Sequence, residues 1–264
     1  MNAEARGMDR RSFLRETAAA AVALTGIGSA QAVECKPFVP DDFDRYDFLF
    51  ARICNNNPAW GYGPGGDKNF LEQLSDVLRV KVKLQPNVRD EYPEQGLSEH
   101  FNALVDLSSI EPMRKFPMLF MTGMGSYRLK QHESERLKEY VCGGGFVLLD
   151  ECVHPGRADE FYQSSYLALV QLFGQEAVRP IPEDHEVYRS VYKIGEPDFH
   201  RWKRGGVPSP GNTGVFIGDR LAVFLCDADI HCGWTDPRDS WIKRADNEEG
   251  IKTGINIVAY AMGH

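Results

Sequence analysis

The chain has 264 residues, with 30 Lys and Arg against 38 Asp and Glu, which gives a formal net charge of −8 at pH 7. An acidic chain without a basic stripe is a poor match to proteins that bind nucleic acid or anionic lipid, so neither is expected as a partner. Once the first 32 residues are set aside, the length is enough for one well-buried core.

The first 32 residues have the pattern of an export signal. The run RRSFL at residues 10–14 resembles the twin-arginine consensus, and the apolar stretch Ala18–Ile27 is too short for a permanent membrane anchor. The sequence AQA at residues 30–32 then offers the small residues that signal peptidase requires. We therefore expect a signal peptide over residues 1–32, recognised by the twin-arginine translocase. The mature chain, residues 33–264, is expected to be a single domain without a membrane span, located in the periplasm or outside the cell.

Early in the mature chain, apolar runs alternate with helical periodicity. Phe48–Ile53 is expected to be a strand, and Asp67 is a suitable N-cap for a helix that continues to Leu78. Val80–Leu84 is a short alternating run, typical of a strand near a sheet edge. Two long loops, 86–96 and 197–212, are expected because both are rich in Pro, Gly and charged residues.

The clearest unit lies in the middle of the chain. Pro117–Thr122 is a continuous apolar run, as in strands buried on both faces. A charged amphipathic helix is expected over Lys130–Cys142, ended by the glycines at 143–145, and Phe146–Leu149 is a second buried strand. Two buried strands joined by a helix predict a right-handed parallel βαβ unit.

The remaining elements extend this alternation. Helices are expected over Asp159–Phe173 and Gly250–Met262, with a buried strand at Ala222–Leu225 between them. The fold class is therefore α/β, a three-layer sandwich around a mostly parallel sheet. Since ligands bind outside the C-terminal ends of the strands in such sheets, the site is expected at that edge.

Five segments carry a resemblance to a known family. They are LFMTGMG (119–125), LKEYVCGGGFVLLDEC (137–152), DHEVY (184–188), DIHCGW (229–234) and GINIVAYA (254–261). Together they resemble a bacterial family of unknown function in the class I glutamine amidotransferase-like superfamily. The resemblance implies a flavodoxin-like sandwich and no established activity.

The amidotransferase triad does not carry over to this chain. Where those enzymes place a nucleophilic Cys after the corresponding strand, this sequence has Asp150, with Cys152 two residues later. Leu148 and Cys152 also replace the glycines that flank such a nucleophile. Glutamine hydrolysis is therefore not expected.

Three residues in succession are candidates for catalysis. Asp150 and Glu151 follow a buried strand and could form a general acid–base pair, or one could cap the next loop while the other faces water. Cys152 could be a nucleophile with His231 or His185 as its base. It could instead be an inert thiol.

Cys152 could also form a disulfide with Cys232. Both cysteines are expected at the same sheet edge, in an oxidising compartment. The sequence leaves the inert thiol, the reactive thiol and the bridge open.

A further set of residues forms the candidate ligand-binding site. Its members follow strands or lie in polar loops near the inferred cleft: Gly123, Met124, His185, Asp229 and Trp234. Asp229 and His231, with Asp150 and His185, could also supply oxygen and nitrogen ligands to a divalent metal. No metal or cofactor is identified by spacing alone.

The expected function is the binding of a small polar ligand at the C-terminal edge of the sheet. A carbohydrate is one candidate, because Trp60, Tyr62 and Trp234 could stack on sugar rings beside carboxylates. Each of these rings could instead pack its loop onto the core, which is expected above all of Trp234. One alternative is a periplasmic hydrolase that acts through Asp150 and Glu151 or through Cys152. Another is an interaction module that binds a cell-envelope protein.

The export signal can be tested directly in the native host. Replacing both Arg10 and Arg11 with Lys should prevent the mature chain from reaching the periplasm, because the translocase recognises the arginine pair. Immunoblots of periplasmic and cytoplasmic fractions measure this. Normal periplasmic amounts of the double variant would show that the chain does not depend on the twin-arginine route.

Overall fold

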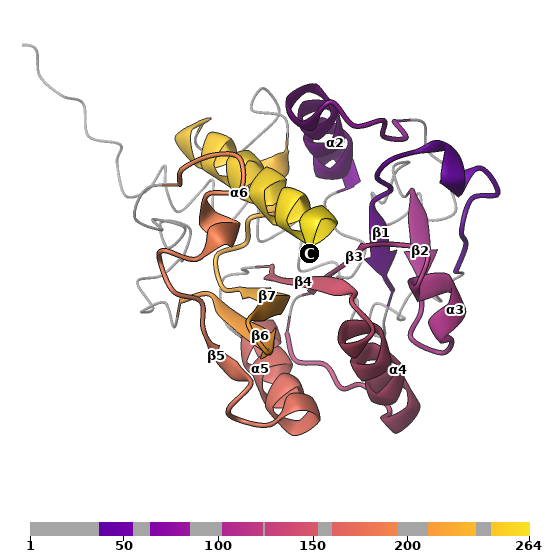
Figure 1. Cartoon of the computed structure of the whole chain (residues 1–264), viewed down its shortest axis with the longest axis vertical. Coiled ribbons are helices and arrows are strands. Elements are labelled where there is room, and N and C mark those ends of the chain that lie inside the picture. Colours follow the sequence, from indigo (N-terminus) through magenta and orange to yellow (C-terminus); the bar gives the residue numbers. More distant parts are fainter. Residues whose placement is uncertain are drawn as a thin grey trace, which may run out of the picture. The chain divides into compact units, whose positions relative to one another are not determined.

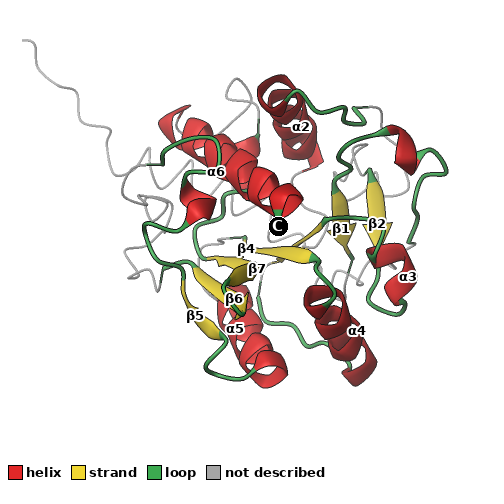
Figure 2. Ribbon diagram, in the orientation of Figure 1, coloured by secondary structure: helices red, strands yellow, loops and turns green. Residues whose placement is uncertain are grey.

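The described part of the protein is a layered α/β domain, seen in a computed structural model (Figures 1 and 2). The structure describes residues 37–54, 64–84, 102–123, 125–152, 160–194, 211–235 and 244–264. All of them fall within one compact unit, residues 34–264. None of the described helices combines the length and apolar character required to cross a bilayer.

A seven-stranded sheet forms the middle layer. Its strands in chain order are β1 (Ala51–Ile53), β2 (Ala103–Val105), β3 (Met118–Gly123), β4 (Phe146–Glu151), β5 (Val178–Pro180), β6 (Thr213–Ile217) and β7 (Arg220–Cys226). In space they follow the order β2-β1-β3-β4-β7-β6-β5. The first five of these are parallel neighbours, whereas β6 pairs antiparallel with both β7 and β5.

Helices cover both faces of the sheet. The longer ones are α2 (Pro64–Leu78), α4 (Gln131–Cys142), α5 (Glu160–Phe173) and α6 (Arg244–Gly263), with the short α3 (Ile110–Met113) and the 3-10 turns η1 (Phe43–Arg45), η3 (Glu186–Tyr188) and η5 (Cys232–Trp234). α2 and α6 pack on one face and α4 and α5 on the other (Figure 1). Each face of the sheet therefore has its own hydrophobic core.

The predicted βαβ unit is confirmed. Its strands are β3 and β4, which pair in parallel from Met118 opposite Phe146 to Gly123 opposite Glu151. Every residue of both strands is buried, as their continuous apolar sequences predict. The strands end together at one side of the sheet, called here the carboxyl edge.

Several boundaries differ from the sequence prediction. The run Val80–Leu84 is not a strand and contributes only a single bridge, between Val82 and Phe48. Asp67 lies inside α2 instead of capping it, since its carboxylate is turned inward to Arg52. β4 continues through Asp150 and Glu151, so these residues end the strand and do not begin a loop.

The antiparallel part of the sheet, β5 and β6, was not predicted. β6 and β7 form a hairpin whose turn begins at Gly218, where a backbone φ of +62° favours glycine. The dipeptide Gly218–Asp219 between two apolar runs is a hairpin signal that could have identified this turn. The sheet is therefore mostly parallel, as predicted, and its β5 and β6 strands are antiparallel to their neighbours.

Gly254 should be indispensable for the packing of α6. An added Cβ there would lie 2.6 Å from Cε2 of Phe70 and 2.9 Å from Nε1 of Trp234. Gly254→Ala should therefore lower the free energy of unfolding by about 1–3 kcal/mol, measured by urea denaturation. Gly263 is the matched control in the same helix, because no heavy atom lies within 4 Å of its added Cβ. Gly263→Ala should change stability by less than about 0.5 kcal/mol, and equal effects of the two variants would contradict this account.

Candidate functional site

The buried charged residues of the described chain gather at the carboxyl edge. β1, β3, β4 and β7 are parallel and end on this side, and the loop after β7 crosses it with the sequence Asp227–His231. Asp227, Asp229 and His231 in this loop are all buried. The loop brings them beside the ends of β1 and β4, as the rule for ligand sites in parallel sheets anticipates.

Asp150 fastens the loop after β7 to the end of β4. Its Oδ1 accepts a hydrogen bond from the Ile230 amide at 3.1 Å, and its Oδ2 accepts one from the His231 amide at 2.9 Å. Burial and the nearby Asp229 carboxylate raise the pKa of Asp150 well above its usual value, while the two amide donors act in the opposite direction. Asp150 is fully buried, so its role in the described structure is to fix the loop.

Glu151 points to the opposite face of β4. Its Oε2 accepts a hydrogen bond of 2.5 Å from the amide of Tyr162, in the first turn of α5. Since successive strand residues face opposite sides of a sheet, Asp150 and Glu151 do not meet as a pair. The alternative in which one of them caps a following element holds for Glu151, but neither faces water.

An ion cluster of Arg52, Asp67 and His231 fills the space between β1 and α2. Nε and Nη2 of Arg52 donate to the two carboxylate oxygens of Asp67 at 2.8 and 2.6 Å. Nε2 of His231 lies 2.7 Å from Nη2 of Arg52 and 2.9 Å from Oδ1 of Asp67. A guanidinium can only donate and a carboxylate can only accept, so Nε2 of His231 accepts from Arg52 when it carries no proton and donates to Asp67 when it does.

The pKa values of the cluster follow from this arrangement. Burial, followed by the charge of Arg52, lowers the pKa of His231. Burial raises the pKa of Asp67, but Arg52 and His231 outweigh it, so the net pKa lies below the usual value. The ion pair of Arg52 with Asp67 was not predicted from the sequence, although a single Arg within an otherwise apolar strand was a usable signal for a buried ion pair.

Trp234 belongs to the core and not to a ligand surface. It is fully buried, stacks on Phe70 with a centroid distance of 4.2 Å, and donates from Nε1 to the Gly250 carbonyl at 3.0 Å. Phe50 and Phe120 complete the aromatic group beneath the ion cluster. Of the two roles considered for Trp234, the structure agrees with the one in which the ring packs its loop onto the core, because this group leaves the ring no solvent-facing side.

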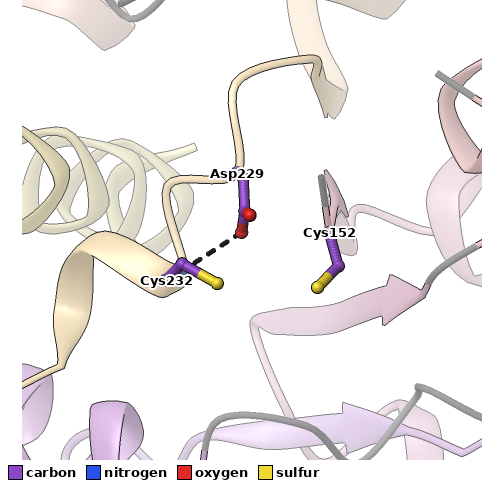
Figure 3. Close-up of side chains that lie close together, drawn as sticks. All are labelled: Cys152, Asp229 and Cys232. Atoms are coloured by element: carbon purple, nitrogen blue, oxygen red, sulfur yellow. Dashed lines mark hydrogen bonds between the residues drawn. The ribbon is translucent and has the colours of Figure 1, made fainter. Parts of the chain in front are cut away.

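Three side chains form a thiol–carboxylate cluster, Cys152, Asp229 and Cys232, shown in Figure 3. The two sulfurs and a carboxylate oxygen lie within 4.8 Å of one another. The side chains come from the end of β4 and from the loop after β7, and both cysteines are half-buried. Asp229 has a left-handed backbone with φ of +54°, and its Oδ1 accepts from the amide of Cys232 at 3.4 Å.

Both cysteines of the cluster are free thiols. The predicted Cys152–Cys232 disulfide is thus not formed here, although the sequence placed the two sulfurs correctly as neighbours. Cys232 lowers the pKa of Cys152 by hydrogen bonding, but burial and the surrounding carboxylates, Asp229 first, raise it by more. The pKa of Cys232 is raised by its bond to Cys152 and by burial. A thiol in this setting is a poor nucleophile.

Both predicted bases of Cys152 are engaged by other groups. The Nε2 of His231 is held between Arg52 and Asp67. His185 lies away from the carboxyl edge, where its ring contacts Phe216 and Tyr260 and its Nδ1 accepts from the Val187 amide at 3.1 Å.

His185 is therefore too far from the carboxyl edge to act with the other predicted ligand-binding and metal-binding residues. Tyr260, its ring neighbour, bonds the amide of Leu221 near the start of β7, at the opposite end of the strand. Gly123 does lie at the carboxyl edge, where its carbonyl accepts from the Cys152 amide at 3.1 Å. Trp60, Tyr62 and Met124 lie outside the described residues.

Residues 49–262 match the family described as a domain of unknown function (DUF4159), so the chain belongs to that family. No curated protein matches the sequence.

The buried His231 makes stability depend on pH. Its folded pKa is lowered, so below the usual value of about 6.5 the unfolded chain binds a proton that the folded chain does not. The free energy of unfolding should thus fall as the pH is lowered through this range, and the fall should be smaller in His231→Gln. Urea denaturation at about pH 7.5 and about pH 5.5 measures this slope. His132→Gln, at an exposed position of α4, should keep the native slope, and an unchanged slope in His231→Gln would contradict the assignment.

Proposed function

We propose that this DUF4159 domain is an exported binding domain that holds a small, positively charged polar ligand at the carboxyl edge of its sheet. The supporting observation is the thiol–carboxylate cluster. Cys152 and Cys232 are half-buried, whereas Asp150, Glu151 and the ion cluster are turned inward to protein partners. Asp229, the third member of the cluster, is buried, so a ligand approaching the described part of this edge would meet the two cysteines before it reaches the carboxylate.

The charge of the edge favours a cation. Asp150 and Asp229 interact closely enough for the Asp229 carboxylate to raise the pKa of Asp150, and both also act on the thiol of Cys152. A bound cation would relieve this like-charge repulsion, while an anion would add to it. A carbohydrate has less support than the sequence suggested, because Trp234 is buried and offers no face for stacking.

The layout of the domain supports a relationship to the class I glutamine amidotransferase-like superfamily. A parallel sheet with helices on both faces agrees with a flavodoxin-like sandwich, and the polar residues gather where such folds bind ligands. Export by the twin-arginine translocase to the periplasm or beyond rests on the N-terminal sequence, residues 1–32.

Hydrolysis has less support than binding. Asp150 and Glu151 are separated by the sheet and each holds backbone amides. The thiol of Cys152 is surrounded by carboxylates that disfavour the thiolate, and His231 is engaged by Arg52. Within the described ranges, no specific contact favours an envelope-protein interface over a small ligand.

The ligand class can be tested by NMR on the isotopically labelled, reduced full chain. The probes are a diamine, a divalent cation, glucose and acetate. The two cations should shift the amides of Cys152 and of residues 229–232, while glucose and acetate should not. Asp229→Asn should weaken the response by at least about tenfold, because it removes a charge from the site.

The matched control lies at the other end of the strands. Arg114 lines a hollow with Lys115 and Gly143–Gly145, so Arg114→Gln should leave the cation response unchanged. Three results would contradict the proposed function: no probe shifts the carboxyl-edge amides, glucose or acetate shifts them more than the cations do, or Asp229→Asn responds like the native chain.

A further inference from the structure

We propose that the ligand is a thiophilic divalent cation of the zinc class, bound by the Sγ atoms of Cys152 and Cys232 and by a carboxylate oxygen of Asp229. This inference rests on the proposed function and names its ligand. It replaces the oxygen and nitrogen ligand set considered from the sequence, since His185 lies elsewhere and His231 is engaged by Arg52.

The donor set selects the kind of metal. Two thiolates and one carboxylate suit Zn²⁺ and similar ions, whereas Mg²⁺ and Ca²⁺ require sites made almost wholly of oxygen. Three protein ligands leave one tetrahedral position for water or for a substrate atom. This is the ligand count of zinc sites that act on a substrate, in contrast to structural sites, which are closed by four protein ligands.

The spacing of the cluster is close to what a metal requires. Two sulfurs each about 2.3 Å from one zinc ion lie about 3.8 Å apart at a tetrahedral angle. In the structure the three donor atoms are within 4.8 Å of one another. A closing movement of about 1 Å, within reach of side-chain rotation, would therefore complete the site.

The backbone around the cluster is already fixed. The Cys152 amide donates to the Gly123 carbonyl, and the Cys232 amide donates to Asp229. Asp150 holds the amides of residues 230 and 231, which lie between the two ligands contributed by the loop. Asp150 is in this sense a positioning residue, as carboxylates behind metal ligands commonly are.

Binding must release protons. Each thiol releases its proton to the buffer as its sulfur binds the ion, so two protons leave as one divalent cation enters. The negative charges of two thiolates and one carboxylate then balance the charge of the cation. Affinity should rise with pH for this reason.

The test uses Co²⁺ as a spectroscopic substitute for Zn²⁺. The reduced full chain, free of oxygen and with a non-thiol reductant, should bind one Co²⁺ with a thiolate-to-cobalt charge-transfer band, and Zn²⁺ should displace it. Cys152→Ser and Cys232→Ser should each lose most of the band. Asp229→Asn should weaken Co²⁺ binding by about tenfold or more. Cys142→Ser is the matched control, because Cys142 is an exposed free thiol at the end of α4.

The native chain provides a second measurement that requires no substitution. At alkaline pH, where thiols of raised pKa also ionise and react, Zn²⁺ should protect Cys152 and Cys232 from iodoacetamide and leave Cys142 reactive, as peptide mass spectrometry would show. The absence of both the band and this protection would overturn the metal site, as would a band that persists in the Cys152→Ser/Cys232→Ser double variant. If the diamine still shifts the carboxyl-edge amides in that case, the proposed function stands and only the metal is wrong. If it does not, both are wrong.

Discussion

The hydrogen bonds that Asp150 accepts from the loop after β7 are the constraint on which the carboxyl edge depends. A buried carboxyl group is costly unless its oxygens are satisfied, and here two consecutive backbone amides satisfy them. The same two bonds decide where Asp229 and Cys232 lie, because these residues flank the amides that Asp150 holds. Asp150, which the sequence offered as a catalytic candidate, thus has a structural task in the described part of the chain. It holds in place the loop that carries two members of the thiol–carboxylate cluster.

The ion cluster of Arg52, Asp67 and His231 has a related effect on the opposite side of the loop. Removing these groups from water is expensive, and only the bidentate geometry and the neutral imidazole make the arrangement tolerable. The aromatic group around Trp234 excludes water beneath it. Charges that are satisfied so completely have little capacity to bind a ligand. Reactivity at the edge is therefore left to the half-buried thiols and the carboxylate between them.

The sequence predicted what depends on periodicity and missed what depends on tertiary contact. β3, α4, β4 and α5 were placed to within a few residues, because continuous apolar runs and helical spacing are local signals. β2 was missed, and Val80–Leu84 was predicted as a strand near the sheet edge instead. Both are short apolar runs, and the sequence does not show which of them pairs with β1. The candidate site was predicted as an edge of the sheet, with one contact inside it, between Cys152 and Cys232. Strand ends indicated Asp150, Cys152, Asp229 and Cys232, whereas only the folded chain shows that His185 turns away.

The sulfurs of Cys152 and Cys232 can either form a disulfide or bind a metal. Which of the two occurs depends on whether the thiols meet a metal ion or an oxidant first. In a reducing cytoplasm the thiols stay reduced, so a metal would meet them before any oxidant does. The proposed twin-arginine route moves chains that are already folded, and a folded domain holds Cys152 and Cys232 beside each other from the start. A thiolate that is bound to a metal is not available to attack a disulfide or to be oxidised as readily as a free one. A cation bound before export would therefore keep the cluster intact in an oxidising compartment. The same pair without its ion would be free to close into the bridge that the sequence first suggested.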